Sequence, residues 1–415
     1  MNKPSLSGMG IAAPQIMLPA APLSLEHWAV LACDQFTSDK DYWRETRRIV
    51  GTHPSTLNMI IPECYLKPST PNSAEALSNS PQRIHGVMRH YCSPQILRTL
   101  PPGFVLTERS TSYSPCRRGL VLAVDLEAYD FADKSTSPIR PSEDTIRDRL
   151  PPRIMIRREA ALDVSHILLL YNDPGGTVIN SAELLAGETL YDFNLMQGSG
   201  HLRGRFIANP APLADAFAAL AANQDILFAV GDGNHSLAAA RETWLEKKAA
   251  GAPENSPSRY ALAEAINIHD EGLRFHPIHR LLFHANPEEV IAFLRGSLSG
   301  MPPAENCAAI TIITAETEQT LTVPLPPGQI AAEPLQAALD EYLSRHSRVS
   351  IDFIHGEDAL AKLARQKDRI GFLLPELDKN TFFNRLSAIG PYPRKSFSIG
   401  EATEKRCYLE TRRLD

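Results

Sequence analysis

Two patterns of apolar and polar positions alternate along the chain. Short continuous apolar runs of about four to eight residues are typical of buried strands, and they occupy residues 27–33, 104–107, 119–125, 164–171 and 226–230. Segments with helical periodicity lie between them at 39–50, 213–223 and 236–250. The turn-rich stretch between 107 and 119 makes its two flanking runs a predicted hairpin. This interleaving predicts a mixed α/β (α+β) fold.

The pattern changes after about residue 285. A second hairpin is predicted at 308–314 and 319–323, followed by alternating helices and strands. The helices are expected at 334–344, 357–366 and 379–388, and the strands at 349–354 and 370–374. A chain of 415 residues exceeds the size at which one core stops growing. We therefore expect a core region over 1–285 and a smaller α/β domain over 286–415, with a tail that returns to the core.

Composition narrows the function classes. The net charge of −6 argues against a dedicated nucleic-acid binder, which would present a basic face. The six cysteines form no CxxC pair, which favours reduced thiols over a disulfide framework. The apolar segment 11–25 is interrupted by Pro14, Pro19 and Pro22, so neither a signal peptide nor a membrane span is expected. A cytoplasmic protein with a small-molecule partner is the expectation, and a homo-oligomer stays open.

The strongest candidate for chemistry joins the run at 226–230 to the helix at 236–250. Two glycines permit a tight turn and close approach of a ligand, and the helix N-terminus favours an anion. His235 is a candidate acid, base or phosphate donor, and Asp232 is a candidate to hold a metal or to orient His235. A plain turn with Asn234 or Asp232 as helix cap is the alternative. The candidate phosphate-binding residues are Gly231, Asp232, Gly233, Asn234 and Ser236.

Two further segments carry candidate groups. Asp34 follows the apolar run 27–33, at the kind of strand end where α/β sites gather. It suits a general base or a magnesium ligand, unless it or Ser38 merely caps the next helix. The arginine-rich segment 139–150 either clamps an anion or forms a self-paired helix face.

Five segments resemble, in order, blocks of the DUF1015 family. They are Trp28–Ser38, Arg118–Tyr129, Gly231–Ser236, Pro277–Arg280 and Pro393–Phe397. Gly-Asp-Gly-Asn-His-Ser is similar to the Asp-Gly-His-His-Arg signature of that family, although Ser236 stands where many relatives carry arginine. The resemblance implies a ParB/sulfiredoxin-like mixed-sheet core, distantly similar to free-serine kinases. It also adds Glu143, Thr145, His279, Arg280 and Lys395 to the candidate site.

The resemblance implies a nucleotide-dependent phosphotransferase acting on a small molecule in a kinase-like way. ATP or ADP with Mg²⁺ would be the cofactor, Asp34 and His235 the catalytic residues, and Arg280 and Lys395 the groups that neutralise phosphate charge. A non-catalytic sensor of a nucleotide or metabolite is the alternative. No resident metal site is expected, because the spacing of His269, His276, His279 and His284 is irregular.

Overall fold

The computed structural model describes residues 4–37, 39–66, 79–132, 134–301 and 306–415. Ser38, a predicted helix cap, lies outside these ranges. The chain divides into two compact units. Unit 1 runs to Leu273 and includes Glu401–Asp415, and unit 2 is Arg274–Gly400. The division falls before residue 285 because strand β14 (Phe275–Phe283) pairs with strands of unit 2.

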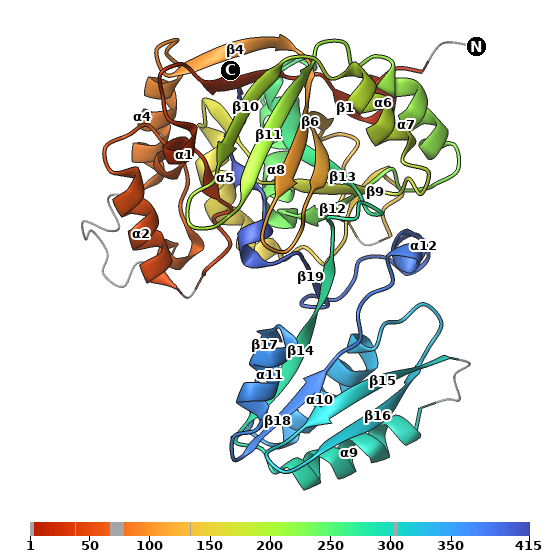
Figure 1. Ribbon diagram of the computed structural model, residues 1–415. Coiled ribbons are helices and arrows are strands. Elements are labelled where there is room, and N and C mark those ends of the chain that lie inside the picture. Colours follow the sequence, from red (N-terminus) through yellow and green to blue (C-terminus); the bar gives the residue numbers. More distant parts are fainter. Residues whose placement is uncertain (1–3, 38, 67–78, 133, 302–305) are drawn as a thin grey trace. The chain divides into compact units, whose positions relative to one another are not determined.

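Unit 1 is built on a mixed sheet with the strand order β10-β11-β5-β6-β13-β9-β12-β7 (Figure 1). Its strands are β10 (Thr189–Asn194), β11 (His201–Ile207), β5 (Phe104–Ser110), β6 (Arg117–Asp125), β13 (Tyr260–Asn267), β9 (Leu168–Tyr171), β12 (Phe228–Asp232) and β7 (Ile139–Pro141), with β1 (Ile11–Ala12) beside β6. The pairs β13–β9 and β12–β7 are parallel, whereas β12–β9 is antiparallel. The predicted hairpin is confirmed as the antiparallel pair β5–β6.

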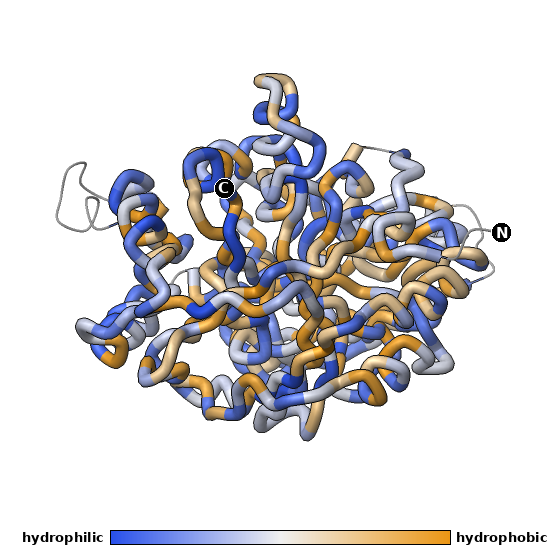
Figure 2. Tube along the Cα trace, turned by 90° about the horizontal axis from the view of Figure 1, so that it is seen from above, coloured by the Kyte–Doolittle hydropathy of each residue, from blue (hydrophilic) through white to orange (hydrophobic). Residues whose placement is uncertain are grey.

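Helices bury the sheet because their apolar residues face it. The alanine-rich face of α8 (Asn234–Ala249) packs Ala238 and Ala240 into the same core cluster as Leu122 of β6 and Val230 of β12. The other helices of unit 1 are α1 (Leu25–Trp28), α2 (Lys40–Val50), α4 (Pro81–Tyr91), α5 (Leu150–Arg158), α6 (Thr177–Leu185) and α7 (Leu213–Ala221). Apolar and polar residues alternate within elements along the trace, as amphipathic packing requires (Figure 2). No helix among the described residues has the length and apolar character needed to cross a bilayer.

The predicted strand at 27–33 is largely wrong. Residues Leu25–Trp28 form helix α1, because Ser24 caps it by accepting the His27 N–H, and only Val30–Leu31 (β3) are extended. The apolar pattern there reflects burial, since the Trp28 ring is buried and its Nε1 donates to the carbonyl of Leu409 at 2.9 Å. The run at 164–171 is likewise divided, into the end of β8 (Leu162–Val164) and β9.

Unit 2 confirms the predicted order of a hairpin followed by alternating helices and strands. Its sheet has the order β16-β15-β18-β14-β17, with β19 beside β14. The strands are β15 (Asn306–Ile313), β16 (Glu318–Leu325), β17 (Ser350–His355), β18 (Arg369–Leu373) and β19 (Phe397–Ile399), and the helices are α9 (Pro287–Ser299), α10 (Ala332–Arg345), α11 (Glu357–Ala364) and α12 (Lys379–Ile389). The mixed α/β class therefore holds in both units.

The last fifteen residues belong to unit 1 and run through its interior. Strand β20 (Cys407–Tyr408) pairs with β3, and β21 (Thr411–Arg413) joins β2 (Gln15–Pro19) and β8 in a sheet that β4 (Leu97–Pro102) completes. Buried Arg109 and Arg117 donate to the carbonyls of this tail, at 3.2 Å and 2.9 Å for Glu404. Such charge-assisted hydrogen bonds to several successive carbonyls fix the path of the tail.

Candidate functional site

A strand, a glycine turn and a helix form the frame of the site, as the sequence predicts. Strand β12 ends at Asp232 and α8 begins at Asn234, with Gly233 between them at a φ of +78°. A Cβ at Gly233 would meet the backbone of Ile167 at 3.2 Å and the Nε2 atom of His166 at 3.5 Å. Both the conformation and the close approach therefore require glycine. The turn delivers the N-terminus of a sixteen-residue helix, where an anion is favoured.

His166 lies directly beside this turn and is only 4% exposed. Its Nδ1 atom is 2.7 Å from the Tyr408 hydroxyl, and its Nε2 atom is 3.4 Å from Asp34 Oδ2. The second contact has the distance of an ion pair, and Nε2 has no hydrogen bond of good geometry among the described residues. A buried imidazole nitrogen beside a helix N-terminus is an unusual placement, and it marks this point as a candidate ligand position.

Asp34 and His166 hold each other ionised. Burial tends to raise the pKa of Asp34, but the nearby charge of the His166 imidazolium, the hydrogen bond from Gln35 and the Lys405 charge outweigh burial and hold this pKa below its usual range. Burial tends to lower the pKa of His166, and the carboxylates of Asp34 and Asp232 reverse this, so the pKa is raised. Each group therefore favours its charged form because the other is charged.

Lys405 and Asp232 complete the charged part of the site. Lys405 Nζ is 3.5 Å from Asp232 Oδ2, while Asp232 Oδ1 accepts the Gly233 N–H at 2.9 Å. We call Asp34, His166, Asp232 and Lys405 the ionised cluster. It contains two carboxylates and two cations, so its own charges balance and a phosphate would add charge that the helix N-terminus must offset.

Two neutral groups adjoin the ionised cluster. The Tyr408 hydroxyl donates to Cys33 Sγ at 3.0 Å. Burial, reinforced by the Asp34 carboxylate, raises the pKa of the Cys33 thiol to about 12, and burial raises the pKa of Tyr408 well above its ordinary value. The thiol therefore stays protonated near neutral pH and is no activated nucleophile.

A second loop lies at the same sheet edge as the glycine turn. Strand β7 runs parallel to β12, and the Ser142 N–H that follows it donates to the Val230 carbonyl at 3.2 Å. Further along this loop, the Ile146 N–H donates to His235 Nε2 at 3.2 Å. This nitrogen is thus an acceptor that positions the loop containing Glu143 and Thr145. His235 therefore has a positioning contact, in addition to any role toward a ligand.

A cavity of about 110 Å³ opens beside the ionised cluster. Cys33, His166, Ser236 and Tyr408 form the wall that it shares with the site. The Ser236 backbone also belongs to the first turn of α8, where its N–H donates to the Gly233 carbonyl at 2.9 Å. The fold therefore brings three distant parts of the sequence together: the glycine turn with Ser236, His166 beside it, and Asp34, which contacts His166.

Three candidate residues lie in unit 2. Arg280 is 2% exposed and donates to the Lys395 carbonyl at 3.0 Å and to Gln336 Oε1 at 2.7 Å. Burial and the neighbouring Arg280 charge lower the pKa of His279 to about 4, and its Nδ1 accepts the Leu374 N–H at 3.1 Å. Within unit 2 the buried Arg280 and His279 side chains contribute to packing, whereas the Lys395 side chain is exposed, and the role of all three toward a ligand stays a prediction.

Sequence reasoning missed three residues of the site. His166 lies in the apolar run 164–171, between β8 and β9, and the signal that could have found it is a single histidine within an otherwise apolar run. Lys405 and Tyr408 come from the tail, which returns to unit 1 as the sequence predicts, but no motif in the tail points to these two side chains. Among the residues with a described position, no group of three or more His, Cys, Asp or Glu side chains is arranged to hold a metal ion.

The fold and this site define a mixed α/β protein in which a strand, a glycine turn and a helix N-terminus lie beside a buried cluster of charged side chains. A family model described as "Protein of unknown function (DUF1015)" matches residues 17–342. The chain belongs to that family, which confirms the resemblance drawn from its motifs. No protein among the curated sequences matches it.

Several solved structures are similar to this chain at low identity. A free serine kinase in complex with AMP is 13% identical, with 71% of this chain and 92% of that chain covered and a TM-score of 0.38. A conserved hypothetical protein from Pyrococcus furiosus is 13% identical over 69% and 93% of the two chains, with a TM-score of 0.36. C-terminally truncated SbnI from Staphylococcus aureus is 11% identical over 70% and 85%, with a TM-score of 0.35. The ParB/sulfiredoxin-like topology stays a prediction.

Proposed function

We propose that this protein is a nucleotide-dependent phosphotransferase that acts on a hydroxyl group of a small molecule. One observation supports it above all: the N-terminus of α8 follows a tight glycine turn and lies beside the buried imidazole of His166. The helix dipole and its first N–H groups favour phosphate oxygens. The His166 imidazolium and the Lys405 ammonium add positive charge within the same site. ATP or ADP is the proposed ligand.

Asp34 is the proposed group that orients the acceptor hydroxyl. Its low pKa makes it a weak base. Phosphoryl transfer nevertheless passes through a loose transition state in which positioning and electrostatics matter more than strong base catalysis. An ionised carboxylate fixed by His166 suits that role, because it accepts the hydroxyl hydrogen bond in a defined direction. His235 and its contact to Ile146 position the second loop.

Magnesium fits this site only together with phosphates. Mg²⁺ is usually held by one or two carboxylates plus substrate phosphates and water, and Asp232, the last residue of β12, places a carboxylate directly before the turn. When bound, the ion would supply positive charge between phosphate oxygens. Asp232 would then exchange its contact with Lys405 for the ion.

Calorimetry tests the phosphate site with a pair of glycine variants. Gly233→Ala introduces a Cβ at the turn, where the backbone of Ile167 is 3.2 Å away. Gly251→Ala is the matched control, since its φ of +92° is also positive but its Cβ meets nothing within 4 Å. We expect ATP or ADP with Mg²⁺ to bind wild type and Gly251→Ala, and to bind Gly233→Ala at least tenfold more weakly. Absence of nucleotide binding by the wild type would refute the proposal.

A sensor that binds a nucleotide without turnover is the second candidate. The observation in its favour is that the ionised cluster and its neighbours contain a weak base, a protonated thiol and a protonated phenol, but no activated nucleophile. Incubation of the wild type with ATP or ADP and a panel of amino acids and hydroxy acids separates the two. Tight binding without any product would favour the sensor.

A further inference from the structure

We propose that the cavity beside the ionised cluster binds the hydrocarbon part of the acceptor, so that the substrate class is a small aliphatic alcohol. This inference rests on the proposed function and names the substrate of the same site. The cavity reaches the cluster at Cys33 and His166, next to Asp34, and extends away from it between α4, α5 and α8. An acceptor could therefore place its hydroxyl at Asp34 and its body in the cavity.

Apolar side chains dominate the wall of the cavity away from the cluster. They include Met59, Ile61, Met88, Ile156, Leu162 and Ala239. Most of these residues belong to one apolar core cluster, in which Met59 and Leu162 are each 1% exposed. Two methionines add flexible, polarisable groups that adapt to an irregular ligand. These six side chains offer no hydrogen bonds to a polar substrate body.

The charged groups that reach the cavity are neutralised by one another. Arg153 forms an ion pair with Glu63 and donates to the Arg149 carbonyl at 2.9 Å. Arg157 is 2.6 Å from Asp163 Oδ1 and donates to the Tyr260 carbonyl at 3.2 Å.

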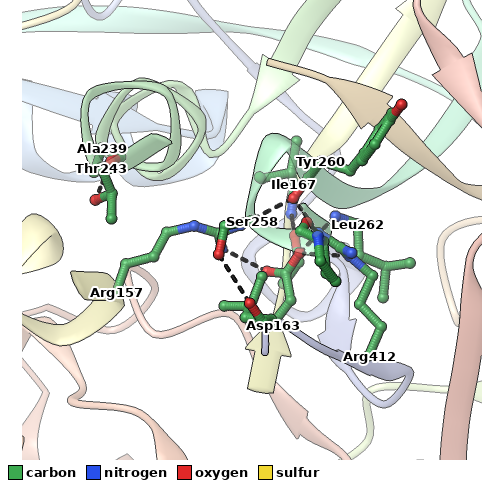
Figure 3. Close-up of polar contacts among 12 residues, drawn as sticks. Arg157, Asp163, Ile167, Ala239, Thr243, Ser258, Tyr260, Leu262 and Arg412 are labelled. Carbon is green, nitrogen blue, oxygen red and sulfur yellow. Dashed lines mark hydrogen bonds and ion pairs between the residues drawn. The ribbon is translucent and has the colours of Figure 1, made fainter. Parts of the chain in front are cut away.

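Asp163 is satisfied on both oxygens, as the close-up in Figure 3 shows. Its second oxygen lies 3.2 Å from Arg412 Nε and accepts the Leu262 N–H at 2.8 Å. Burial tends to raise the pKa of Asp163, but Arg157 and Arg412 outweigh it and hold the pKa below its usual range. A charged substrate body would have to break these pairs, which is costly in a buried site. An uncharged one leaves them intact.

The size of the cavity limits the hydrocarbon part. An engineered apolar cavity of about 150 Å³ holds a benzene molecule, and this cavity has about 110 Å³. Room for about four to five carbon atoms follows from that comparison. Because transfer of each methylene from water is favourable, affinity should rise about fourfold per added carbon until the cavity is full.

A homologous series of alcohols tests the proposal. Binding of 1-propanol, 1-butanol, 1-pentanol and 1-hexanol would be measured by calorimetry, with and without ADP and Mg²⁺, beside ethylene glycol and L-serine. We expect the affinity to rise about fourfold per carbon up to 1-pentanol and then to level off. Ethylene glycol and L-serine should bind more weakly than 1-butanol. Equal affinity along the series, or tighter binding of either polar probe, would overturn the proposal.

Two cavity variants and one control locate the binding. Ala239→Leu fills the cavity from α8 and should weaken 1-pentanol binding at least tenfold. Met88→Ala enlarges the cavity and should move the best chain length up by one or two carbons, which keeps the test decisive if Ala239→Leu does not fold. Ala249→Leu, on the exposed end of α8, should leave the series unchanged. An unchanged series in folded Ala239→Leu and Met88→Ala would place the alcohols elsewhere and refute the cavity.

The two proposals fail separately. Alcohols that bind with the expected dependence on chain length and variant, in a protein that binds no nucleotide, would refute the phosphotransferase but retain the apolar site. Nucleotide binding without alcohol binding would retain the phosphate site and refute the aliphatic substrate class.

Discussion

Replacing Asp34 with asparagine should reverse the protonation preference of His166. The carboxylate lies 3.4 Å from Nε2 of an imidazole that is 4% exposed. At an effective dielectric constant of about 20, two unit charges at that distance attract by about 5 kcal/mol before the cost of burial is subtracted. Burial by itself lowers the pKa of His166, and the carboxylates overcome it. Without Asp34, we expect the pKa to fall from above 6.5, its ordinary value, to below it.

The same change should alter how stability depends on pH. In the wild type the folded-state pKa of His166 is raised, so its contribution is complete below about 6.5 and is lost as pH rises through the folded-state pKa. In Asp34→Asn the folded-state pKa is lowered, so stability should instead decrease as pH falls below 6.5. Asp34 itself stabilises the wild type above its unfolded pKa of 3.8, and this is lost on acidification. At pH 6 we expect a loss of about 3 kcal/mol, as for a broken buried ion pair.

Proton NMR of the histidine ring, together with urea unfolding at pH 5 to 8, measures both effects. Asp192→Asn is the matched control, because it removes a carboxylate from the exposed ion pair with His201 and should leave the His166 titration unchanged. Asp34→Asn should also reduce transfer far more than nucleotide affinity, because the lost carboxylate charge and the lost His166 charge cancel in the net charge of the site, whereas a group used in the transition state is missing. A His166 titration that is the same in wild type and Asp34→Asn would refute the electrostatic reasoning.

Three further predictions follow from contacts at and near the site. His235→Ala should weaken nucleotide binding by about 1.5–3 kcal/mol, whereas His235→Gln should weaken it less, because glutamine retains an acceptor for the Ile146 N–H. Calorimetry measures both losses, and equal losses would contradict the positioning contact. Nucleotide binding should require Mg²⁺, because the ion offsets phosphate charge, and unchanged affinity in EDTA would argue against it. Arg406→Met should lower the free energy of unfolding by about 3–5 kcal/mol, because Arg406 lies 3.0 Å from both Glu264 and Glu410 in the interior. Urea unfolding measures this loss. A smaller loss would mean that the two carboxylates are protonated or solvated in the variant.

The elements that the sequence predicts well are those with strong local signals. The glycine turn at Gly233 follows the buried strand β12 and precedes a long alanine-rich helix, so each local preference agrees with the fold. The elements of unit 2 were recognisable for the same reason. The pattern at 27–33 failed because burial of Trp28 and pairing of Val30–Leu31 with the tail, rather than strand propensity, determine its apolar residues.

The ionised cluster was only partly predictable, because it depends on contacts between distant segments. Asp34 and Asp232 stand at ends of apolar runs, where a site is expected. His166 resembles a strand residue in the sequence, and only its position beside Gly233 and Asp34 gives it a chemical role. No periodicity or spacing relates it to Lys405, which enters from the tail.

The tail therefore belongs to the site as much as the glycine turn does. Antiparallel pairing of β3 with β20 sets Tyr408 opposite Val30 and Cys407 opposite Leu31. This register brings the Tyr408 hydroxyl between Cys33 and His166, at 3.0 Å from Sγ and 2.7 Å from Nδ1. A shift by one residue would turn Tyr408 to the other face of the pair, because side chains alternate along a strand. The orientation of His166 toward Asp34, and hence the charge that both groups hold, depends on that register.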